Sequence, residues 1–90
     1  MKKSDQDTIM QFPCQFPIKV MGMASDDFDT MVVEIIKKHV TKLSKDAVKS
    51  RLSQEGNYVA VTVTIEAESR QQLDNIYLDL TEHKNVLMAL

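Results

Sequence analysis

The sequence has 90 residues, of which 43% are hydrophobic and 27% are charged, a composition typical of one small globular domain. Eleven Lys and Arg residues against thirteen Asp and Glu residues give a formal net charge of −2. No overall positive field therefore attracts nucleic acid or an anionic membrane, and we expect neither as a partner.

Residues 1–10 are polar and lack periodicity, so we expect a flexible tail ahead of one domain over residues 11–90. The start resembles no signal peptide, and no apolar window is long enough to span a bilayer. Cys14 is the single cysteine, which excludes an internal disulfide. These features favour the cytoplasm.

The first predicted strand covers residues 18–23, where Ile18, Val20 and Gly22 alternate with polar or methionine positions. The motif Gln-Phe-Pro occurs twice in residues 11–17. Each proline keeps the preceding residue extended, so this segment is predicted to be an extended lead-in to the strand.

A helix is predicted next, with Ser25 or Asp26 as its N-terminal cap. Apolar residues recur at three- and four-residue steps and form one face: Phe28, Met31, Val32, Ile35, Ile36 and His39. Cationic residues gather near the predicted C-terminus, where the helix dipole favours them: Lys37, Lys38, His39 and Lys42.

Two further strands follow. Residues 46–54 alternate weakly and carry exposed cations, as an edge strand does. Gly56 and Asn57 tolerate positive φ and predict a hairpin turn. Residues 58–67 alternate clearly, with four β-branched residues on one face: Val59, Val61, Val63 and Ile65.

The second helix is predicted to begin at Ser69, because Gln72 three residues later completes a capping-box pattern. Its buried stripe is Leu73, Ile76, Tyr77 and Leu80. Asn85 is expected to close the helix in the left-handed conformation, and residues 86–90 to form a short last strand.

The order βαββαβ predicts an α+β, ferredoxin-like two-layer sandwich, with a four-stranded antiparallel sheet and both helices on one face. The first and third strands should lie at its centre. The open face is then partly apolar and is expected to contact a partner protein or a second copy. The residues expected on it are Lys19, Met21, Met23, Lys49, Arg51, Ala60, Thr62, Thr64, Leu87 and Ala89.

Three activities of such domains are excluded by missing residues. RNA-recognition domains stack bases on aromatic residues of the central strands, where this sequence has Lys19, Met21 and Thr62. Copper carriers have two cysteines in the first strand–helix loop, where this chain has Ser25 and Phe28. Acylphosphatases clamp phosphate with an arginine in that loop, and this loop is acidic and lacks one.

No catalytic or metal site is predicted. Cys14 lies between prolines and not at a helix N-terminus, where a thiolate would be stabilised. His39 and His83 fall at predicted helix ends, where a cation is favoured without further function. One cysteine and two histidines without close spacing do not make a zinc site. We expect a non-enzymatic domain without a cofactor.

Three segments resemble the YbeD-like family of small bacterial proteins: residues 12–22, residues 33–39 and residues 56–65. The resemblance extends from Phe12 to Leu90 and is weakest over residues 41–54. It implies a ferredoxin-like fold similar to ACT regulatory domains, and a place near lipoate metabolism through neighbouring genes.

Two hypotheses about function remain open. By analogy with ACT domains, a small metabolite would bind in the first strand–helix loop, at Gly22, Met23, Ala24, Ser25 and Asp26. The alternative that we favour for Gly22 is that it only lets the strand bend toward the helix. Alternatively, the chain is an interaction module that uses the open face at Lys19, Met21, Ala60, Thr62 and Thr64.

Overall fold

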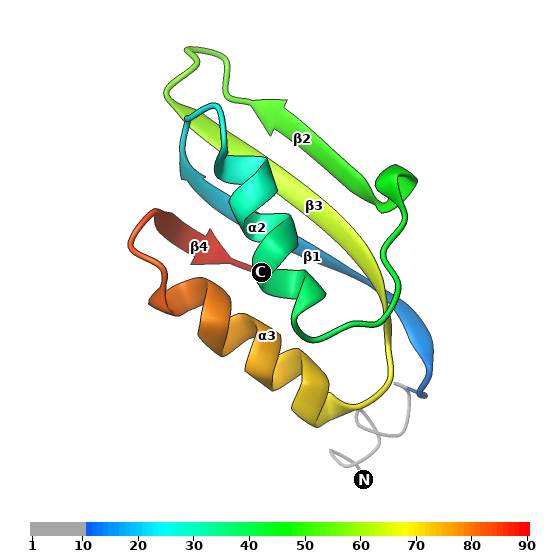
Figure 1. Ribbon diagram of the computed structural model, residues 1–90. Helices are drawn as coiled ribbons and strands as arrows, with labels where there is room; N and C mark the ends of the chain where they lie inside the picture. The colour runs from blue at the N-terminus through cyan, green and yellow to red at the C-terminus, as the bar shows by residue number, and fades with distance from the viewer. Residues whose placement is uncertain (1–10) are drawn as a thin grey trace, which may run out of the picture.

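The computed structural model describes residues 11–90 (Figure 1). The predicted tail over residues 1–10 lies outside this range. In chain order the elements are β1 (Cys14–Met23), α2 (Phe28–Lys37), the 3₁₀ helix η1 (Lys45–Ala47), β2 (Val48–Leu52), β3 (Tyr58–Ala67), α3 (Arg70–Glu82) and β4 (Val86–Ala89).

The four strands form one sheet in the order β2-β3-β1-β4, and every neighbouring pair is antiparallel. Both α-helices pack on the same face of this sheet (Figure 1). The predicted ferredoxin-like fold is confirmed. As predicted, the first and third strands lie at the centre of the sheet and the second strand lies at its edge.

The core lies between the helices and the inner face of the sheet. Every second residue of β3 is buried there, from Val59 to Ala67, and β1 contributes Ile18 and Val20. The helices complete the core with Phe28, Val32, Ile35, Ile36, Leu73, Ile76 and Leu80. Tyr77, predicted to share this stripe, is only partly buried.

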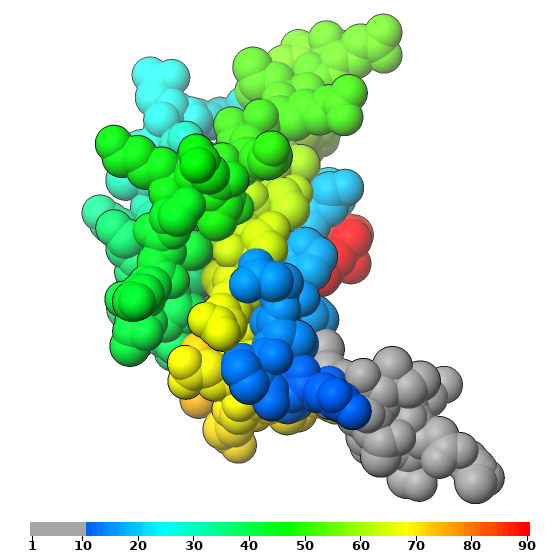
Figure 2. Space-filling model, turned by 90° about the vertical axis from the view of Figure 1, so that its right-hand side faces the viewer, coloured from blue at the N-terminus to red at the C-terminus, as the bar shows by residue number. Residues whose placement is uncertain are grey.

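β1 begins at Cys14 and not at Ile18, so the predicted lead-in belongs to the strand. Cys14 pairs with Ala67, and Figure 2 shows the start of β1 in dark blue beside the end of β3 in yellow. Pro17 pairs with Thr64 beyond the last residue that pairs with β4. Because β3 is the one strand of residues 11–90 that lies beside β1 there, a residue without an N–H is tolerated.

The predicted cap of the first helix is wrong. The residue before α2 is Asp27, and its side chain makes no capping hydrogen bond. The Ser25 hydroxyl donates to Asp27 Oδ1 at 3.2 Å, so both side chains are engaged with each other. The helix also ends at Lys37, which leaves the predicted basic residues His39 and Lys42 beyond it.

The second helix begins as predicted. Ser69 Oγ accepts a hydrogen bond from the Gln72 backbone N–H at 3.0 Å. The Gln72 side chain returns to the N–H of Glu68 at 2.7 Å and not to that of Ser69.

The predicted left-handed end of this helix is wrong, because Asn85 has negative φ. The helix ends instead through His83, whose backbone is extended. His83 Nδ1 accepts a hydrogen bond from the Asn85 N–H at 3.1 Å, so the chain turns without a left-handed residue.

The second strand is shorter than predicted. β2 covers Val48–Leu52, and the preceding Lys45–Ala47 forms a 3₁₀ turn capped by Ser44. The hairpin after β2 turns at Gly56, where φ is +78°. The expected role of glycine in this turn is confirmed, whereas Asn57 keeps negative φ.

Gly22 is closely packed by this chain's own residues. A Cβ at this position would lie 2.6 Å from Phe28 Cζ and closer still to the carbonyl oxygen of Asn85. The missing side chain therefore lets the β1 backbone contact both α2 and the turn before β4. The space that the missing Cβ leaves is therefore filled by Phe28 and Asn85 of this chain and not left open to a ligand.

We predict that Gly22→Ala lowers the free energy of unfolding by about 2 kcal/mol, because the added methyl overpacks the Phe28 ring and a backbone carbonyl. Gly56→Asn is the matched control. It keeps a residue that tolerates positive φ, and no atom lies within 4 Å of its Cβ. Urea unfolding would contradict this account if both variants kept the wild-type midpoint.

We predict that Ser69→Ala destabilises the domain by about 1 kcal/mol, since it removes the side-chain acceptor for the Gln72 N–H. Ser25→Ala should change the stability little, because the Ser25 hydroxyl contacts only an exposed carboxylate. Thermal unfolding followed by circular dichroism compares the two. Equal losses from both substitutions would show that Ser69 does not act as a cap.

Candidate functional site

The open face of the sheet is built by the alternation of β1 and β3. Thr62 lies between Lys49 and Lys19 in one cross-strand row. In the next row, Ala60 lies between Arg51 and Met21. All five residues predicted for the interaction face, Lys19, Met21, Ala60, Thr62 and Thr64, lie on this side of the sheet.

A bulge in β4 changes which of its residues reach the open face. Met21 pairs with Met88, but Gly22 pairs with Val86, so Leu87 is an extra residue in β4. The backbones of Lys19 and Leu90 exchange two hydrogen bonds. The open face therefore carries Met88 and Leu90. The sequence-based choice of Ala89 is wrong, because it pairs with Val20 and packs on the core, and strict alternation takes no account of the bulge at Leu87.

An apolar strip runs along the β1–β4 side of this face. We define it as Met21, Met23, Tyr58, Met88 and Leu90, which cross-strand pairing brings together. Four of them are about half exposed: Met23 (54%), Tyr58 (50%), Met88 (47%) and Leu90 (61%). Methionine adapts its shape to different contact partners, and tyrosine adds a large rigid surface. The strip can therefore bind an apolar surface.

A cation hollow lies beside the strip, toward β2. We define it as Lys19, Lys49 and Arg51 around the small side chains of Ala60 and Thr62, and its volume is about 430 Å³. All three cations are exposed. Within residues 11–90, neither a hydrogen bond nor an ion pair engages any of their side chains. Thr64 belongs to the same face but does not line the hollow.

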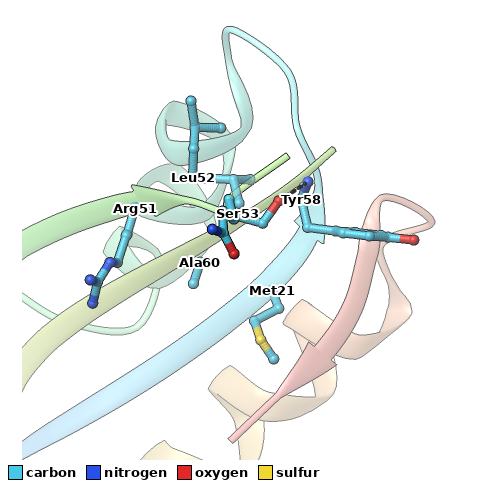
Figure 3. A pocket seen from close by; sticks show the side chains of 8 residues that line it. Met21, Arg51, Leu52, Ser53, Tyr58 and Ala60 are labelled. Atoms are coloured by element: carbon cyan, nitrogen blue, oxygen red, sulfur yellow. Dashed lines mark hydrogen bonds between the residues drawn. The ribbon is translucent and has the colours of Figure 1, made fainter. Parts of the chain in front are cut away.

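A smaller hollow of about 280 Å³ joins the two regions at the end of the β2–β3 hairpin. Figure 3 shows Arg51, Ala60 and Met21 projecting from the same side of the sheet, with Tyr58 at the edge. Ser53 Oγ accepts a hydrogen bond from the Tyr58 N–H at 3.1 Å, which holds the hairpin closed (Figure 3).

Charge is unevenly distributed between the two layers. Among the strand residues that alternate onto the open face, the acidic one is Glu66, which pairs with Gln15. It lies four residues along β3 from Thr62, about 13 Å away. The acidic residues on or beside the helices are Asp26, Asp27, Asp29, Glu34, Asp46, Glu68, Asp74, Asp79 and Glu82. A slightly acidic chain thus presents a cationic sheet face.

The loop predicted to bind a metabolite is only partly open. Ala24, Ser25 and Asp26 line a hollow of about 410 Å³ together with Asp29 and β2 residues. Met23 belongs to the apolar strip, and Gly22 is buried against Phe28. The structure therefore brings three of the five predicted residues to one hollow. Whether a metabolite binds there stays a prediction.

The histidines and the cysteine lie apart from this face. His39 Nε2 and Asp79 Oδ2 are 2.6 Å apart, and Gln72 Nε2 donates to the His39 carbonyl oxygen at 2.8 Å. These contacts tie the segment after α2 to α3. Sequence spacing missed them because the partners are far apart in the chain. Cys14 is partly buried against the core.

Tyr77, whose pKa is perturbed, lies on α3 and so also apart from the open face. Burial raises the pKa of the Tyr77 phenol above 10.0, so this side chain is neutral near pH 7. Across residues 11–90, no three His, Cys, Asp or Glu side chains are grouped as metal ligands. In the same range, no helix is long and apolar enough to cross a membrane.

Comparisons with known proteins agree on one family. The model of the family described as "Protein of unknown function (DUF493)" matches residues 7–90. The chain is 45% identical to a UPF0250 protein of Chromobacterium violaceum, covering 96% of this chain and 97% of that one. It is 36% identical to the UPF0250 protein NMC1112 of Neisseria meningitidis serogroup C, covering 99% and 98% respectively.

The fold is also similar to that of a solved protein. The solution structure of HP0495 from H. pylori superposes with a TM-score of 0.68 and covers 90% of this chain and 85% of that one. The sequence identity is 14%, so the comparison concerns the fold alone.

Proposed function

We propose that this chain, which belongs to the UPF0250 (YbeD-like) family of small bacterial proteins, is a non-enzymatic domain that binds a partner protein on its open sheet face. The observation that carries the proposal is the apolar strip. Half-exposed methionine, tyrosine and leucine side chains are gathered on one side of the sheet. Apolar patches of this kind are typical of protein interaction sites.

Charge favours a different protein over a second copy of this chain. A two-fold symmetric dimer uses the same patch on both subunits. The cations Lys19, Lys49 and Arg51 would then occupy both halves of the interface, and like charges there cost free energy. A partner with apolar and acidic side chains would complement both parts of the face. We place this binding in the cytoplasm, which the single cysteine supports.

We predict that Thr62→Asp weakens partner binding about tenfold or more, because it places a carboxylate in the middle of the open face. Thr41→Asp is the matched control, at an exposed position after α2. The partner is first identified by photo-crosslinking from position 62 in bacteria that carry the gene. It is then purified and titrated with the wild type and both variants by calorimetry.

Thermal unfolding of both variants controls for the fold. The proposal fails if the crosslinked partner binds Thr62→Asp as tightly as the wild type. It also fails if the crosslinks from position 62 join two copies of this chain, which would make the face a homodimer interface.

The hollow beside the β1–α2 loop supports a second candidate, regulation by a small metabolite as in ACT domains. Its lining includes Asp26 and Asp29 together with Ser25. Two carboxylates favour a ligand that bears an amine. They would repel the carboxylate of lipoate, so the hollow adds no support for the expected link to lipoate metabolism.

For this candidate we predict that amino acids with a cationic side chain shift the amide resonances of residues 24–26 in an NMR titration, whereas lipoate does not. Asp26→Asn should weaken binding because it removes a negative charge from the hollow. Asp74→Asn, on an exposed part of α3, should leave binding unchanged. If neither class of ligand shifts these resonances at millimolar concentration, the metabolite candidate is abandoned.

A further inference from the structure

We infer that the cation hollow recognises acidic side chains of the protein that binds the open face. The inference rests on the proposed function and specifies the chemistry of its partner. The first support is electrostatic. Lys49 and Arg51 lie two residues apart on one face of β2, which places their Cα atoms about 7 Å from each other. Lys19 lies two strands away, and its Cα atom is about 10 Å from that of Lys49.

These like charges raise the free energy of the unbound domain, because no carboxylate within residues 11–90 pairs with them. An anion between them would be attracted by all three at once. The sheet holds their backbones in fixed places, so the three flexible side chains project around one hollow.

The floor of the hollow is suited to an oxyanion. Ala60 and Thr62 are the small residues between the cations, and they leave about 430 Å³ that larger side chains would fill. The Thr62 hydroxyl can donate a hydrogen bond, and a guanidinium such as that of Arg51 can hold a carboxylate with two parallel hydrogen bonds.

Continuity with the apolar strip favours a protein segment over a free small anion. Ala60 pairs with Met21, and Lys19 pairs with Leu90, so the hollow and the strip share cross-strand rows. From β2 to β4 these rows extend about 14 Å. A free phosphate would contact the hollow alone. A segment that carries both acidic and apolar side chains can contact both regions.

The test uses the full chain labelled with nitrogen-15 and two short synthetic peptides. One alternates glutamate with leucine, and the other alternates glutamine with leucine. We expect the glutamate peptide to shift the amide resonances of Lys49, Ala60 and Thr62, and added salt to weaken the effect. Lys49→Glu with Arg51→Glu should weaken its binding about tenfold. Lys37→Glu with Lys42→Glu changes the net charge equally and should leave it unchanged.

The unfolding midpoint of each variant is measured first. If the variant with Lys49→Glu and Arg51→Glu fails to fold, Lys49→Gln with Arg51→Gln replaces it. Equal binding of both peptides, or loss of binding in the Lys37 and Lys42 control, overturns the inference. Shifts at the hollow with inorganic pyrophosphate but not with the glutamate peptide also overturn it and indicate a small-anion site.

The two proposals fail separately. If the glutamine peptide binds at Met21 and Met88 in every variant, the face still docks an apolar partner and only the acidic recognition is lost. If neither peptide binds and no crosslinked partner responds to Thr62→Asp, both proposals fail.

Discussion

The antiparallel ladder between β1 and β3 decides which side chains this small domain buries and which it presents. It pairs residues from Cys14 with Ala67 to Met23 with Tyr58 without interruption. Because side chains alternate along a strand, one ladder sets two faces at once. The inner face takes the β-branched residues that pack against α2 and α3. Within residues 11–90 both α-helices pack on this inner face, so the outer face is open over the described part of the chain.

Much of the fold could be predicted because alternation and helical periodicity are local patterns. The bounds of β3 and the cap at Ser69 depend on neighbouring residues, and both were predicted correctly. The start of β1 could not be predicted, because the long β3 continues to pair with it past Pro17. Asn85 was assigned a left-handed conformation by its residue type, whereas His83 provides another way for the helix to end.

The candidate site could likewise be predicted where it depends on local patterns, and not where it depends on tertiary pairing. Alternation alone placed Lys19, Met21, Ala60 and Thr62 on the open face. The bulge at Leu87 could not be seen in the sequence, and it moved Met88 and Leu90 onto that face. The three cations were each predicted to face outward, but their grouping around one hollow depends on the register of three strands. Register arises from tertiary pairing and not from any one segment.

The open face combines exposed apolar side chains with cations that limit which surfaces can bind to it. An uninterrupted apolar face would promote association between copies of the chain. Here Lys19 and Arg51 border the apolar strip and oppose that association through like-charge repulsion. Under the proposed function, the same charges would attract a partner that carries carboxylates, so one set of residues would disfavour self-association and favour that partner. A cationic face on a slightly acidic chain is thus the arrangement that the proposed binding of an acidic, partly apolar partner requires.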